Sequence, residues 1–236
     1  LDKITISAST KSETKYITPV IVNFADVKGS INGNDTIILC DLPGRDDTAG
    51  AEVDIANSIS VRDVITKSKS VKPVFVISYY GQGDRLQGFK ELIHFLKEII
   101  SNPQDHSKHF TFIFTKFPKD KRKEIHKAVE TLISDMKSSE KTKELDQTAL
   151  AILQDMLEKT KEDKLITIDP IEDKEPGRTL DKIAGVYSIP RPRDIFQFAL
   201  SKKPKGVLEE QIWQHRTVIF KAYKRCDLEL IKYKWG

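Results

Sequence analysis

The chain has 236 residues, of which 39% are hydrophobic and 31% are charged. This composition is rich enough in apolar residues to bury a core, and it excludes a collagen-like or wholly disordered chain. The 39 Lys and Arg residues nearly balance the 35 Asp and Glu residues, leaving a net charge of +4, so we expect no specific nucleic-acid partner.

Along most of the chain, short apolar runs alternate with segments in which apolar residues recur every three to four positions, as in an amphipathic helix. They predict strands at residues 17–27, 36–41, 73–79, 109–115 and 165–168, and helices at residues 51–68, 86–100, 121–136 and 145–161. The first two strands flank a turn rich in Gly, Asn and Asp, so we expect them to form an antiparallel hairpin. The pattern predicts an α/β fold: a mostly parallel central sheet with one antiparallel hairpin strand and helices on both faces, in three αβα layers. The nearly uninterrupted apolar run at 36–41 predicts a strand buried on both faces, with Cys40 in the core.

The amino-acid composition of the chain changes after residue 170. Prolines crowd the segment 171–205, which favours a loop-rich connection with a short helix near residues 194–200. A final amphipathic helix is predicted at residues 207–223. We therefore assign residues 1–170 to one α/β domain and residues 171–236 to a C-terminal extension, whose basic Pro190–Arg193 segment and Trp213 helix either dock a partner or pack on the core.

The two cysteines, Cys40 and Cys226, are too few for a disulfide framework, which favours an intracellular, cytoplasmic setting. No apolar run approaches the roughly 20 residues of a membrane span, so no span is expected. The first residues lack a signal-peptide pattern and an initiating methionine, so we expect the chain to be a fragment of a longer protein.

Candidate ligand-binding residues follow the second predicted strand, where it ends in Asp41-Leu42-Pro43-Gly44. In phosphate-binding NTPases an Asp at this point holds Mg²⁺ through water, because a hard cation prefers oxygen ligands. A Gly at the fourth position lets a backbone N–H approach a phosphate closely. The four residues alone are equally typical of an ordinary exit from a strand into a turn.

Two further motifs accompany this one in the order found in a known family. Ser12-Glu13-Thr14-Lys15 precedes it, and a predicted buried strand leads into Thr115-Lys116-Phe117-Pro118. This order resembles the P-loop GTPases, most closely the branch of septins, chloroplast outer-envelope import GTPases and immune-associated GTPases. The resemblance covers about residues 11–170 and implies that residues 1–170 are a GTPase-like domain truncated at its N-terminus.

The resemblance assigns a role to each matching position. Thr14 would be the first-switch threonine, with its hydroxyl on magnesium and its N–H on the terminal phosphate, and Gly44 would be the phosphate-sensing turn. Asp41 would hold the magnesium ion, and Lys116 would lay its aliphatic stem along the purine ring, with Thr115 supporting the loop. The alternatives are a solvated Ser/Thr-rich loop for Thr14 and a surface lysine at a strand end for Lys116.

Three departures from the family pattern are evident. The phosphate-loop motif Gly-x-x-x-x-Gly-Lys-Ser/Thr is absent, so a first strand and phosphate loop either precede Leu1 or were never part of the domain. Pro118 stands where the family has the Asp that recognises guanine, and a proline side chain accepts no hydrogen bond. Unless Asp120 replaces that Asp, a preference for guanine over adenine is supported by the family resemblance alone. Arg45 follows the Asp-x-x-Gly motif and cannot act as a base, so it either stabilises charge or faces solvent.

The leading hypothesis is a GTPase-type switch domain that binds GTP or GDP with Mg²⁺. If a phosphate loop precedes Leu1, water would attack the γ-phosphate, and hydrolysis would time the assembly of a larger complex. The expected partners are other proteins or further copies of the chain, in an intracellular setting that includes the cytoskeleton. The alternative is a pseudo-GTPase that serves as a structural or interaction module in a large intracellular assembly. A small-molecule hydrolase is disfavoured because the chain lacks Gly-x-Ser-x-Gly.

Overall fold

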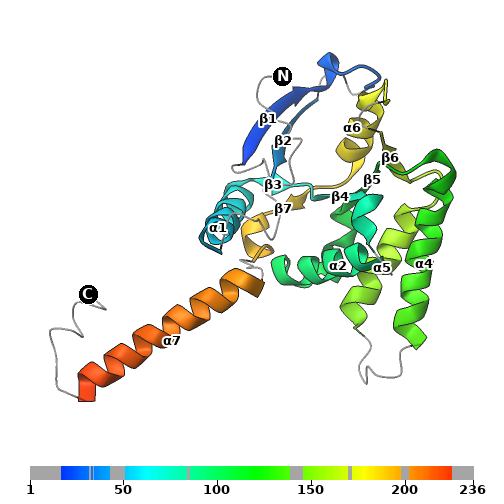
Figure 1. Ribbon diagram of the computed structural model, residues 1–236. Helices are drawn as coiled ribbons and strands as arrows, with labels where there is room; N and C mark the ends of the chain where they lie inside the picture. Colours follow the sequence, from blue (N-terminus) through cyan, green and yellow to red (C-terminus); the bar gives the residue numbers. More distant parts are fainter. Residues whose placement is uncertain are drawn as a thin grey trace. The chain divides into compact units, whose positions relative to one another are not determined.

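The computed structural model describes residues 17–31, 33, 35–42, 51–83, 86–138, 146–169, 172–197 and 202–224 (Figure 1). The chain divides into two compact units. The first contains Leu1–Thr18, Asp41–Val61 and Ala199–Gly236, and the second contains Pro19–Cys40 and Arg62–Phe198. The predicted helices at 51–68 and 207–223 are present as α1 (Ala51–Lys67) and α7 (Lys202–Lys224).

A parallel three-stranded sheet forms the centre of the second unit. Its strands are β4 (Val74–Ser78), β5 (Thr111–Thr115) and β6 (Ile166–Ile168), in the order β4-β5-β6. Ser78 pairs with Thr115, and Thr115 pairs with Ile168, so the three strands end at the same level. The predicted α/β fold with a parallel sheet is therefore confirmed.

Helices cover both faces of this sheet, as the αβα prediction requires (Figure 1). Strand β5 is buried from Thr111 to Phe114 because it has a strand on each side and helices above and below. Phe112 and Phe114 share one core cluster with the helices α2 (Gln87–Ile99), α4 (Arg122–Ser138) and α5 (Gln147–Lys159). Ile113 is also buried but lies outside that cluster, and so does Ile183 of α6 (Pro176–Gly185), the helix on the other face.

One lysine fastens α5 to the turns that precede β5. The Lys159 ammonium donates to the carbonyl oxygens of Ser107 (2.7 Å) and Phe110 (2.8 Å), and it lies 2.6 Å from the Asp155 carboxylate. The short elements held in this way are α3 (Pro103–His106) and the 3₁₀ turn η4 (Ser107–His109). Burial lowers the pKa of Lys159 and raises the pKa of Asp155, because it penalises both charged forms.

The hairpin strands form a sheet of their own. Among the described residues, strands β1 (Thr18–Asn23) and β2 (Thr36–Asp41) pair only with each other, and η1 (Phe24–Asp26) follows β1. Exposed and half-buried positions alternate along β2, where Ile38 is 60% exposed and Cys40 is exposed. The prediction that residues 36–41 are buried on both faces, with Cys40 in the core, is wrong, because β2 has only one strand beside it in the described part of the chain.

The segment after β6 also differs from the prediction. Helix α6 was not predicted, and residues 171–205 are less loop-rich than their prolines suggested. At residues 194–197, where the predicted helix would begin, the structure has the end of a 3₁₀ turn, η6 (Pro192–Asp194), and then Phe196, which bridges to Ile100. Residues 198–200 of that prediction lie outside the described residues. Two short strands, β3 (Ser70–Val71) and β7 (Ile189–Pro190), pair antiparallel. In the residues that the structure describes, no helix is both long enough and apolar enough to cross a membrane.

Candidate functional site

The level carboxyl ends of β4, β5 and β6 form one edge of the parallel sheet. Open α/β sheets bind ligands outside this edge, because the loops that leave it diverge. The Tyr79 N–H donates to the Thr115 carbonyl oxygen at 2.9 Å, which keeps the β4 and β5 ends together. The predicted residues Thr115 and Lys116 therefore lie at the edge where a ligand is expected.

Lys116 adopts a conformation that is uncommon for a residue with a side chain. Its φ is 60°, in the left-handed region, and its side chain is exposed. The next residue, Phe117, is buried, and its ring lies against Phe114 (5.8 Å between centroids) and Tyr79 (5.3 Å). The sharp turn at Lys116 thus returns the chain to the core and leaves the lysine stem and ammonium at the edge of the sheet.

The loop after β4 brings two tyrosines to the same edge. Tyr79 is half-buried, whereas Tyr80 is 79% exposed, and their rings are 5.4 Å apart at right angles. The Ser78 hydroxyl accepts a hydrogen bond from the Gly81 N–H at 2.9 Å, which closes the turn η2 (Tyr80–Gln82). Neither tyrosine was predicted to be a site residue, although two aromatic residues at the end of a predicted strand were a usable signal.

Asp169 is a second residue of the edge that was missed. It follows Ile168, which pairs with Thr115, so Asp169 and Lys116 each come one residue after a registered pair. The Asp169 side chain accepts from the Glu172 N–H at 3.2 Å, and its carbonyl oxygen accepts from the Asp173 N–H at 2.9 Å. These bonds organise the first turn of the β6–α6 connection.

The residues after Lys116 lead into the start of α4. Pro118 and Asp120 are both exposed, and Asp120 lies in the 3₁₀ turn η5 (Lys119–Lys121). The hydrogen bond of Lys121 to Glu124 (2.7 Å) raises the pKa of that lysine, with a small contribution from the Asp120 charge. Lys121 therefore keeps its positive charge at neutral pH at the start of α4.

Of the remaining predicted site residues, the structure describes Asp41. Asp41 is the exposed last residue of β2 and belongs to the first unit, whereas Thr115 and Lys116 belong to the second. Thr14 and Gly44 lie outside the described residues, as does Arg45. Of the predicted site residues, the structure therefore describes Thr115, Lys116 and Asp41.

An exposed carboxylate such as Asp41 fits a magnesium ion that arrives with a nucleotide. Mg²⁺ takes one or two carboxylates together with phosphate oxygens and waters, and it does not need a cage of protein ligands. In the residues that the structure describes, no three His, Cys, Asp or Glu side chains gather into a cage for a metal. Of the two residues predicted to contact magnesium, Thr14 and Asp41, the structure describes Asp41.

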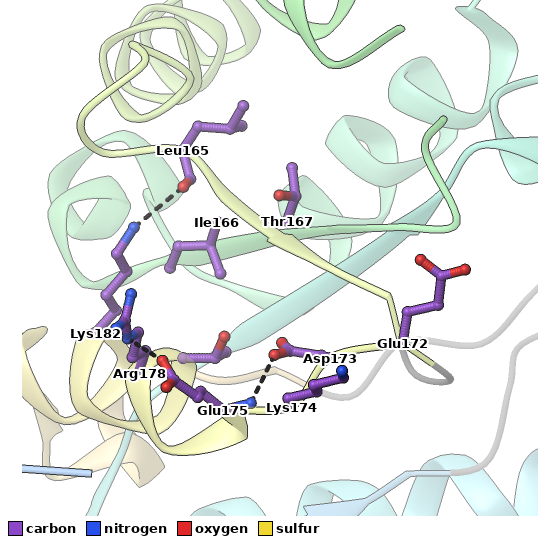
Figure 2. A pocket seen from close by; sticks show the side chains of 10 residues that line it. Leu165, Ile166, Thr167, Glu172, Asp173, Lys174, Glu175, Arg178 and Lys182 are labelled. Carbon is purple, nitrogen blue, oxygen red and sulfur yellow. Dashed lines mark hydrogen bonds and ion pairs between the residues drawn. The ribbon is translucent and has the colours of Figure 1, made fainter. Parts of the chain in front are cut away.

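An open cavity of about 590 Å³ borders β6 and α6, and Figure 2 shows its lining. Lys182 donates to the Leu165 carbonyl oxygen (3.2 Å), and Arg178 pairs with Glu175 (2.6 Å). Its acidic and basic side chains balance, so the cavity has no charge preference, and none of the predicted site residues lines it. The full lining is Leu165, Ile166, Thr167, Glu172, Asp173, Lys174, Glu175, Arg178, Thr179 and Lys182.

Comparison with known proteins adds no relative to this description. No family model matches the chain, and neither a curated protein nor a solved structure is detectably similar to it.

Proposed function

We propose that this chain is a nucleotide-binding domain of the GTPase type, with its purine subsite at the carboxyl edge of β4, β5 and β6. The observation that supports this most is the backbone at Lys116. A left-handed residue directly after the buried strand β5 leaves the lysine stem exposed at the edge, beside the Tyr79 loop. A flat heterocycle can pack on such a stem, and the ammonium adds a favourable contact to its ring oxygen or nitrogen atoms.

The other predicted residues would have the roles that their positions in the GTPase-like motifs imply. Asp41, at the exposed end of β2, would hold the magnesium ion of a GTP–Mg²⁺ or GDP–Mg²⁺ complex, while Thr14 and Gly44 would contact the ion and the terminal phosphate. Bound magnesium neutralises phosphate charge and polarises the γ-phosphate toward attack by water. Pro118 offers no acceptor to the guanine edge, so we expect GTP and ATP to bind with similar affinity.

Titration of a fluorescent guanine nucleotide, followed by anisotropy with Mg²⁺ present, tests the proposal. Lys116→Ala should raise Kd about ten-fold or more, because it removes the surface on which the purine packs. Lys119→Ala is the matched control: it removes an exposed lysine three residues away and should leave Kd within about two-fold of native. Asp41→Ala should remove the Mg²⁺ dependence of binding. Absence of saturable binding, or equal losses in the two lysine variants, would refute the purine subsite.

The second candidate is a pseudo-GTPase that acts as an interaction module. Helix α7 favours it, since Ile212 and Trp213 are large apolar residues that stay more than half exposed on that helix. Exposed aromatic and aliphatic residues of this kind are typical of protein-binding surfaces. A chain that binds no nucleotide but self-associates in light scattering, and loses this association with Trp213→Ala, would support the second candidate over the first.

A further inference from the structure

The turn of the β1–β2 hairpin lies against the first two turns of α6, about 150 residues further along the chain. The Gly177 N–H donates to the Lys28 carbonyl oxygen at 3.1 Å. The Ser30 hydroxyl donates to one oxygen of the Asp181 carboxylate at 2.7 Å, and the Ile31 N–H donates to the other at 2.9 Å. One carboxylate therefore holds two consecutive residues of the turn.

The two backbones meet without side chains between them. A methyl group on Gly177 would overlap the Ser30 backbone nitrogen and lie 2.6 Å from the carbonyl carbon of Gly29. Gly29 itself has φ +87°, and a methyl group there would lie 2.9 Å from the Glu175 β-carbon. Backbone atoms cannot rotate away as a side chain can, so this contact fits only one placement of the turn.

The other end of α6 is held as well. The Lys72 ammonium, in the connection between β3 and β4, donates to the Ile183 carbonyl oxygen at 3.4 Å and to that of Ala184. These carbonyls lie in the last turn of the helix, where a cation is favourable, and that of Ile183 also accepts from the Val186 N–H at 3.2 Å. Burial lowers the pKa of Lys72, and the charge of Asp35, at the start of the hairpin's second strand, partly opposes this shift. Helix α6 is thus a fixed support on which the hairpin turn rests.

We propose that Asp181 is a positioning residue, which fixes the β1–β2 hairpin on α6 and so determines where β2 presents its last residue, Asp41. The hairpin strands pair only with each other in the described part of the chain, so the contact at α6 replaces the anchoring that neighbouring strands would provide. The placement of the hairpin is independent of the proposed function. The expected effect of Asp181 on magnesium binding at Asp41 rests on the proposed function.

Hydrogen–deuterium exchange of the native chain and its variants tests the placement. Asp181→Ala should speed exchange in peptides covering residues 18–40 by about ten-fold or more, because both acceptor oxygens are lost. Exchange in residues 110–117 should stay native. Asp181→Asn keeps one acceptor oxygen and should return hairpin exchange to within about three-fold of native.

A pair of glycine variants in the same helix makes the test independent of charge. Gly177→Ala should speed hairpin exchange to a similar extent, whereas Gly185→Ala should leave it native, because a methyl group at Gly185 meets nothing within 4 Å. Alanine favours the helix at both positions, so a loss confined to Gly177 must come from the contact with the turn.

Three outcomes decide the matter. Native hairpin exchange in both Asp181→Ala and Gly177→Ala overturns the proposal, and so does acceleration that extends equally to residues 110–117. If nucleotide binds, Asp181→Ala should raise the Mg²⁺ concentration for half-maximal binding about three-fold or more, with recovery in Asp181→Asn. If the native chain binds no nucleotide, the proposed function fails, while the exchange measurements still decide the placement of the hairpin.

Discussion

Strands β5 and β2 have similarly apolar sequences but very different surroundings. Strand β5 (TFIFT) has a strand on each side and helices on both faces, and its first four residues are buried. Strand β2 (TIILCD) has one partner strand, and Ile38 and Cys40 face solvent. An apolar run in the sequence shows that a strand can be buried. Whether it is buried depends on the strands and helices that pack beside it in the folded chain. The turn of the hairpin is held on α6 by hydrogen bonds from Ser30 and Ile31 to Asp181, and Phe24, directly after β1, is buried.

The largest effect that this comparison predicts is for a β5 core residue. Phe114 is 1% exposed and lies against the rings of Phe89 and Phe117. Phe114→Ala should lower the free energy of unfolding by about 3–5 kcal/mol, since it removes apolar contacts and leaves a cavity. The matched change Ile38→Ala on β2 should cost less than about 1 kcal/mol, because most of that side chain is already in water. Urea denaturation of both variants measures the two changes in the free energy of unfolding. Equal losses of stability would contradict the difference expected between β5 and β2.

A smaller effect is expected for Lys159, whose contacts are polar but partly buried. Lys159→Met keeps most of the side-chain volume but removes the ammonium donor from the Phe110 carbonyl and the Asp155 carboxylate, while the Ser107 carbonyl keeps its bond from the Phe110 N–H. We expect the free energy of unfolding to fall by about 2–3 kcal/mol. Lys127→Met, at an exposed position of α4, is the control and should be nearly neutral. A neutral Lys159→Met in the same urea titrations would mean that water replaces the ammonium at no cost.

The two regions also differ in how far the sequence predicted them. The strand at 109–115 and the helices around it were predicted because their apolar periods are uninterrupted and their surroundings are regular. Helix α6 was missed because the prolines of residues 171–205, Pro176 among them, were interpreted as loop residues. Proline is well suited to the first turn of a helix, and glycine is required at 177 by the close approach of Ser30. That second reason is a tertiary contact and cannot be read from local sequence.

The candidate site shows the same limit. Thr115 and Lys116 were placed at a strand end by the hydrophobic run before them, and the structure confirms that position. Tyr80 and Asp169 join that edge only because β4, β5 and β6 are in register, and register is a property of the assembled sheet. The relation of Asp41 to this edge stays a prediction, since it depends on how β2 is held and not on the motif that contains it.

The smallest effect is expected on the solvent side of α5, where charge rather than burial is involved. Hydrogen bonds from Lys161 (2.5 Å) and Lys164 (2.6 Å) lower the pKa of Glu158 from 4.5 to about 2. Between these values the unfolded chain binds more protons than the folded one. The contribution of Glu158 to stability is therefore complete above pH 4.5 and is lost as the pH falls toward 2.

Glu158→Gln should accordingly flatten the acid side of the stability profile. The variant should differ slightly from native at about pH 6, the difference should shrink at about pH 3, and ~1 M salt should remove most of it, because all three side chains are about half exposed and screened. Glu162→Gln, at an exposed position four residues on, is the control and should not change with pH in this way. Urea midpoints at the two pH values, with and without salt, measure the effect. A difference that salt leaves intact would show that Glu158 acts through packing, and burial would then matter on the outer face of α5 as it does for β5.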